Sequence, residues 1–157
     1  MKPILLAAIP ELALGLLVYL GILFKILYLP FANLVLTISL LSLGSLYMIL
    51  GWLLFSNTNL ASFTQVKKNN YQLLKIGFGV FSGLFMSVVS VCCWEYIMRL
   101  PPARIMMVAA IVFFVALTIV AISLSIKYQR FALVYLRVVL SLIFVSFPII
   151  AFIQLLR

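Results

Sequence analysis

One glutamate, Glu11, lies within an otherwise apolar stretch, AAIPELALGLLVYLG, which covers residues 7–21. A charge inside a membrane helix is costly, so such a residue faces protein or water and is a candidate for function. On a helix, Glu11 shares its face with Ala7 and Gly15, four residues away on either side. Because membrane helices approach closely at small residues, we expect its cation to come from another helix or chain. The residue type fits a proton carrier and also a polar contact between helices.

Three more charged residues lie in apolar stretches. Glu95 precedes Arg99 by four residues, which is the favourable order for an ion pair on one helix. We expect this pair to anchor a helix end, and a proton site is the alternative. Arg137 follows Lys127 and Arg130, and we expect its long side chain to extend back toward them and toward the membrane boundary.

The residue types that are missing restrict the chemistry. The chain has no histidine, which excludes bis-histidine haem, histidine zinc sites and a Ser/His/Asp triad. Cys92 and Cys93 are adjacent, which suits neither a redox motif nor a chelate, and we expect them to act as small hydrophobic residues. No glycine-rich phosphate loop or dinucleotide fingerprint is present. We therefore expect no catalytic residue, no bound metal and no cofactor, and no enzymatic activity from the chain alone.

A stripe of small residues runs through GFGVFSGLFMSVVS, where Gly79, Gly83 and Ser87 recur every four residues. Such spacing is typical of seams at which membrane helices pack closely. It predicts a face that contacts protein. Small seams without a set of ligand residues indicate a component of a larger assembly.

Composition shows what surrounds these residues. Of 157 residues, 68% are hydrophobic and 8% are charged, whereas about half and about a quarter are usual in globular domains. A small soluble fold cannot bury so much apolar surface, so the chain is predicted to lie in lipid. Helices or closed barrels satisfy every backbone polar group there, and the apolar runs lack the alternation of barrel strands.

The sequence thus predicts an all-α, polytopic integral membrane protein with one transmembrane domain, residues 1–157, and no soluble domain. Five helices are expected at residues 4–28, 31–55, 71–99, 103–126 and 131–156, with a polar loop at 56–70. Prolines end or bend them because proline lacks a backbone donor: Pro30 and the pair Pro101–Pro102 separate helices, and Pro148 predicts a kink. Pro10 is expected within the first turns, where few bonds are lost. Short connections predict antiparallel hairpins.

The net charge of +9 does not indicate nucleic-acid binding. The basic residues lie near the predicted helix ends, as membrane anchors do: Lys2, Lys25, Lys67, Lys68, Lys75, Arg99, Arg104, Lys127, Arg130, Arg137 and Arg157. The expected partners are therefore lipids and other membrane chains.

Three stretches resemble one family, in the right order along the whole chain. The opening IPELALGLLVYL resembles the start of subunit 2 of NADH–ubiquinone oxidoreductase, respiratory complex I. The loop NTNLASFTQVKK is similar to a polar segment of that family, through Asn59, Phe63 and Lys67 or Lys68. The stretch FALVYLRVVLSL, residues 131–142, is similar to the family's fifth helix.

The chain also departs from the family. The fifth helix of the family carries a glutamate of the proton path, where this chain has Val139, with Arg137 as the nearest charge. The family's subunit is much longer, so the resemblance implies an N-terminal piece of a split or reduced subunit 2 without a complete proton channel.

The resemblance implies a structural subunit of the membrane arm of complex I, in the mitochondrial inner membrane. Its partners would be the other membrane subunits, including a chain that carries the remaining subunit 2 helices. Two alternatives stay open: a small homo-oligomeric proton-coupled transporter centred on Glu11, and another small respiratory subunit such as subunit 6.

Overall fold

The computed structural model describes residues 3–56, 70–101, 103–127 and 135–146. In these ranges it contains four long helices and one shorter helix: α1 (Pro3–Ile26), α2 (Ala32–Ser56), α3 (Asn70–Ile97), α4 (Ala103–Lys127) and the helix Tyr135–Ser146. The all-α prediction is confirmed.

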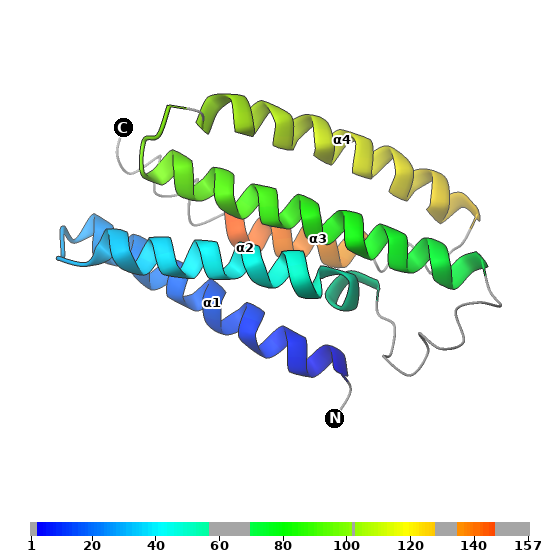
Figure 1. Ribbon diagram of the computed structural model, residues 1–157, viewed down its shortest axis with the longest axis horizontal. Coiled ribbons are helices and arrows are strands. Elements are labelled where there is room, and N and C mark those ends of the chain that lie inside the picture. Colours follow the sequence, from blue (N-terminus) through cyan, green and yellow to red (C-terminus); the bar gives the residue numbers. More distant parts are fainter. Residues whose placement is uncertain (1–2, 57–69, 102, 128–134, 147–157) are drawn as a thin grey trace.

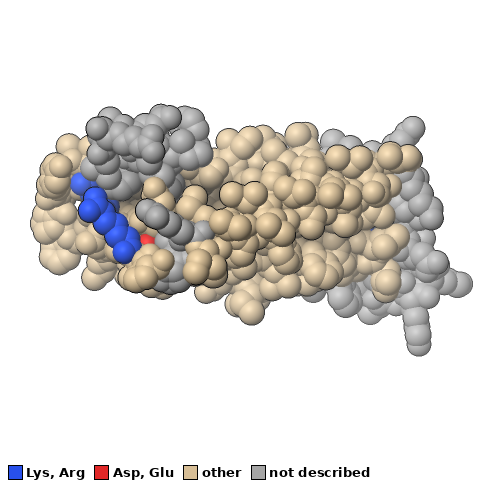
Figure 2. Space-filling model, turned by 90° about the horizontal axis from the view of Figure 1, so that it is seen from above, with Lys and Arg blue, Asp and Glu red and all other residues tan. Residues whose placement is uncertain are grey.

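Each of the four long helices contains an apolar segment of 18 residues or more. Such segments are long enough to cross the ~30 Å hydrocarbon core of a bilayer. On the face drawn in Figure 2, the visible Lys, Arg, Asp and Glu atoms lie toward the left end, and the long middle part of that face is uncharged. The chain is therefore a multi-pass membrane protein.

The helix ends agree with the sequence prediction to within two residues for α1 to α4. The fifth predicted helix, 131–156, contains the described helix Tyr135–Ser146, while its remaining residues and Pro148 lie outside the described part. Ser56 and Asn70, the ends of the predicted loop, belong to α2 and α3, and residues 57–69 between them are not described.

Pro10 lies inside α1. α1 begins at Pro3 and continues through Pro10, which is its eighth residue and thus beyond the first turn. A proline there removes one backbone hydrogen-bond donor from the helix. In the predicted helix, 4–28, Pro10 was the seventh residue, so the structure places it one residue deeper.

Consecutive helices pack side by side in antiparallel order: α1 on α2, α2 on α3 and α3 on α4 (Figure 1). The helix Tyr135–Ser146 lies behind α2 and α3 in this view and contacts α1, where the Tyr19 hydroxyl donates to the Phe144 carbonyl at 3.3 Å. The last described helix thus returns to the first.

The closest packing is between α2 and α3. A Cβ atom added to Gly83 would lie 2.6 Å from the Tyr47 carbonyl oxygen and 2.7 Å from the Gly51 Cα atom. One added to Gly79 would lie 2.9 Å from the Trp52 carbonyl oxygen. The predicted small-residue seam is thus a protein contact, as expected. Its partner is α2 of the same chain, so the seam itself gives no evidence of a second subunit.

A buried apolar core extends from this contact. It includes Leu43, Leu54, Phe85 and Met86, each at most 2% exposed, and reaches Val138 of the shorter helix. On α4, by contrast, Leu117 and Ala121 are the buried residues among the described side chains. α4 therefore presents most of its apolar surface outward, as a helix in lipid or against another chain does.

The α2–α3 contact gives a first prediction, for the variant Gly83→Ala. Its methyl group would collide with backbone atoms of α2, which cannot move aside as a side chain can. We expect a loss of about 1–3 kcal/mol in unfolding free energy, the usual range for overpacking. Unfolding in mixed micelles of rising sodium dodecyl sulfate content, followed by tryptophan fluorescence, measures it.

Gly77→Ala is the matched control on the same helix. A Cβ atom there meets nothing within 4 Å, and alanine favours helix over glycine. Its stability should equal or slightly exceed that of the wild type. Equal stability of the two variants would contradict the close α2–α3 contact.

Candidate intramembrane charge site

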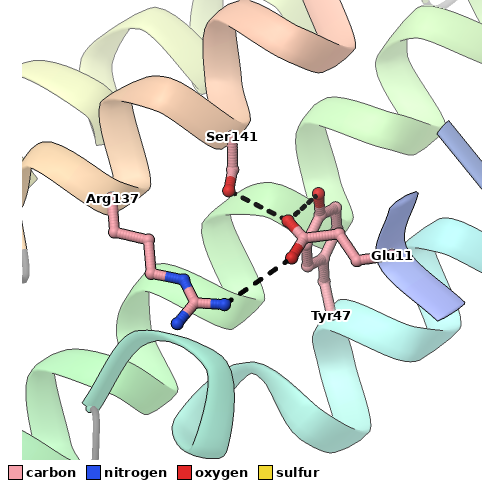
Figure 3. A network of polar contacts seen from close by, with 4 residues as sticks. All are labelled: Glu11, Tyr47, Arg137 and Ser141. Carbon is pink, nitrogen blue, oxygen red and sulfur yellow. Dashed lines mark hydrogen bonds and ion pairs between the residues drawn. The ribbon is translucent and has the colours of Figure 1, made fainter. Parts of the chain in front are cut away.

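The carboxylate of Glu11 is the centre of a polar network between three helices (Figure 3). The Tyr47 hydroxyl from α2 donates a hydrogen bond to Glu11 Oε1 at 2.9 Å. The Ser141 hydroxyl donates to the same oxygen, also at 2.9 Å. Arg137 Nη2 lies 3.9 Å from Glu11 Oε2. Two hydroxyl donors and one cation thus converge on a single acid.

Helical spacing places these groups together. Arg137 and Ser141 are four residues apart on the helix Tyr135–Ser146, so both face α1. On α1, Gly15 lies one turn after Glu11, and a Cβ atom there would overlap the Phe144 ring. The small residue predicted to lie on the Glu11 face therefore does allow close approach of another helix.

The site is largely removed from the surroundings. The Glu11 side chain is 12% exposed and that of Arg137 is 29% exposed, while Tyr47 is fully buried. A buried charge is tolerated when it is paired and hydrogen-bonded. The network meets both conditions for Glu11, although the 3.9 Å separation from Arg137 is longer than a direct hydrogen bond.

The expectation for Glu11 is confirmed, because its cation comes from another helix. Arg137 was expected to extend back toward Lys127 and Arg130, and its guanidinium faces Glu11 (Figure 3). Opposite charges attract more strongly in a medium of low dielectric constant than in water, which favours the pair. Arg130 and the Lys127 side chain lie outside the described part.

Sequence reasoning missed Tyr47 and Ser141. Ser141 carried a usable signal, since it follows Arg137 by four residues and therefore shares its helix face. Tyr47 carried none, because a tyrosine in an apolar helix is equally typical of a membrane boundary or a core.

The expected ion pair of Glu95 and Arg99 is not formed. α3 ends at Ile97, so Arg99 lies beyond the helix, in a left-handed conformation with φ of 57°. The spacing of four residues therefore no longer places the two side chains on one face. Among the described residues Glu95 has no ion-pair partner, and its Oε2 atom is buried without a hydrogen bond.

Ser87, the third residue of the small stripe, faces Gly44 of α2.

The two cysteines are free thiols, Cys92 buried and Cys93 partly buried. In the described ranges, no group of three or more histidine, cysteine, aspartate or glutamate side chains is placed to hold a metal ion. Among the described residues, the polar network around Glu11 is therefore the strongest candidate for a functional site.

The fold and this network define a small polytopic membrane protein with a charge pair between its helices. No protein-family model matches the chain, and no curated protein or solved structure is significantly similar to it.

The network gives a second prediction, a double-mutant cycle of Glu11→Gln and Arg137→Gln. Either single change leaves the other charge without its partner, so we expect a loss of about 1–3 kcal/mol in unfolding free energy. The double variant should lose less than the sum of the two, because neither charge is then left unpaired. Unfolding in detergent micelles measures all four proteins. Strictly additive losses would show that the two side chains do not interact.

Proposed function

We propose that this chain is a structural subunit of the membrane arm of proton-translocating NADH–ubiquinone oxidoreductase, respiratory complex I, in the mitochondrial inner membrane. In this proposal it supplies the N-terminal helices of a split or reduced subunit 2. One observation carries the proposal: two of the stretches that resemble the family meet at the charge site. Glu11 belongs to the first stretch, and Arg137 and Ser141 to the last.

The chemistry of the pair supports a structural role over proton transfer. A guanidinium does not release its proton in proteins, so Arg137 is a permanent counter-charge for Glu11. A lysine, by contrast, can lose its proton when it is buried. At the position of the family's glutamate this chain has Val139, which cannot bind a proton. The proposed subunit therefore contributes packing and no proton path of its own, and it binds neither NADH, flavin, iron–sulfur clusters nor quinone.

The outer surface supports contacts with further chains. Large apolar side chains on α4 are widely exposed, among them Ile105 at 76% and Val112 at 63%. Exposed apolar patches of this kind bind lipid or other membrane helices. In the proposal, other membrane subunits cover part of this surface, including a chain with the remaining subunit 2 helices.

A homo-oligomeric proton-coupled transporter is the second candidate. It is favoured by the hydroxyl groups of Tyr47 and Ser141 on one oxygen of Glu11, since hydroxyls both donate and accept hydrogen bonds and can relay a proton. In this case Glu11 would bind and release the transported proton.

A third prediction separates these candidates. The tagged chain is extracted gently from its native membrane and the particle mass is measured. The respiratory proposal expects a large hetero-complex that oxidises NADH with a quinone, whereas the chain purified alone should have no activity. A dimer or tetramer of this chain alone, or redox activity of the isolated chain, would refute the proposal.

The variant Glu11→Gln sharpens this test. For a structural subunit, it should lower the amount of assembled complex several-fold, because a loss of about 1–2 kcal/mol in stability reduces abundance to that extent. The NADH oxidation rate per assembled particle should stay unchanged. For a transporter, the oligomer should persist and proton-coupled uptake should be lost. Ser45→Ala is the control, since Ser45 is exposed and bonds only within its own helix turn.

A further inference from the structure

A second polar feature lies far from Glu11, at one end of the helices. The end of α1, the beginning of α2 and the end of α3 surround a cleft of about 740 Å³. This lies within the usual range of ligand-binding pockets, roughly 300–1,000 Å³. Its walls include the cations Lys25 and Arg99, the amide of Asn33 and the aromatic residues Tyr28 and Phe31.

Unusual backbone conformations build this cleft. Tyr28, Phe31 and Arg99 are the described non-glycine residues with positive φ, at 53°, 68° and 57°, and all three line the cleft. Tyr28 and Arg99 end their helices where glycine is usual: Leu29 N–H bonds to the Phe24 carbonyl, and Leu100 N–H to the Glu95 carbonyl, both at 2.9 Å. Bulky side chains rarely adopt this conformation, and such residues gather at functional sites.

The cleft brings two positive charges together. Lys25 Nζ donates a hydrogen bond to the Ile97 carbonyl oxygen at 3.0 Å, which holds the lysine at the end of α3. Arg99, two residues after the end of α3, lines the same cleft. Neither of the two acidic side chains of the protein lines the cleft. Two cations and the first N–H groups of α2 at one cleft favour a negatively charged ligand.

We propose that this cleft binds the phosphate of an acidic phospholipid headgroup. Arginine and lysine are the usual phosphate ligands of proteins, and basic pockets between membrane helices bind acidic headgroups. The surroundings favour a lipid over a free phosphate: Tyr28 is 89% and Phe31 is 74% exposed, and aromatic residues of this kind lie at the membrane boundary. The site is separate from the Glu11 network and does not depend on the proposed function.

The test compares two lipids on the purified full-length chain in neutral detergent. Phosphatidylglycerol and phosphatidylcholine with identical acyl chains are added, and bound lipid is counted by native mass spectrometry. We expect the wild type to retain phosphatidylglycerol over phosphatidylcholine roughly tenfold, given two cations near the headgroup. Arg99→Gln and Lys25→Gln should each reduce this preference several-fold, and Arg99→Lys should keep most of it.

Lys75→Gln is the matched control, because it removes the same charge from α3 outside the cleft. Its lipid preference should equal that of the wild type. An equal loss in Lys75→Gln and Arg99→Gln, or no preference in the wild type, would overturn the proposal. Millimolar inorganic phosphate should not displace the lipid, since it lacks acyl chains to contact Phe31. Displacement at that concentration would assign the cleft to free phosphate and overturn the lipid assignment.

Discussion

The fold depends on the cost of placing one carboxylate in a membrane. Glu11 lies in the apolar segment Ile9–Ile26 and is largely buried, so its charge requires donors and a cation from protein. These come from residues far along the chain: Ser141 is 130 positions away and Arg137 is its neighbour on the same helix. These partners add to the contacts that Tyr19 and Gly15 of α1 make with Phe144. Together these contacts pack the first and last described helices against each other.

Tyr47 joins this charge site to the glycine seam. Its backbone carbonyl faces Gly83 of α3, and its hydroxyl donates to Glu11 of α1. One α2 residue thus takes part in both contacts, and its side chain is fully buried between them. A shift of α2 against α3 would therefore move the hydroxyl away from the carboxylate. Van der Waals packing along the seam and polar contacts at Glu11 support each other for this geometric reason.

The helices could be read from the sequence, and most of their contacts could not. Length, hydropathy and the prolines placed α1 to α4 to within two residues, because the bilayer fixes how long an apolar span must be. Faces toward lipid and faces toward protein are equally apolar, so periodicity does not tell them apart. Charges and glycines do mark contacts, and Glu11 and Gly83 were recognised in this way. A sequence does not say whether the partner is in the same chain: Gly83 was expected against protein, and that protein is α2 of the same chain. Arg99 does not face Glu95 because it adopts a left-handed conformation just after the end of α3, and the sequence contains no glycine or other signal for this conformation there.

The same geometry bears on what the Glu11 site can do. If Glu11 bound a proton, its carboxyl group would lose the charge that pairs with Arg137, and its hydrogen bonds with Tyr47 and Ser141 would have to rearrange. Those three contacts also hold α1, α2 and the helix Tyr135–Ser146 together, so their loss would loosen the packing of the fold. Arg137 cannot take part in proton transfer, since a guanidinium does not release its proton in proteins. The arrangement therefore favours a fixed contact between the helices. The surfaces that are open to lipid or other molecules are the apolar face of α4 and the basic cleft at the helix ends.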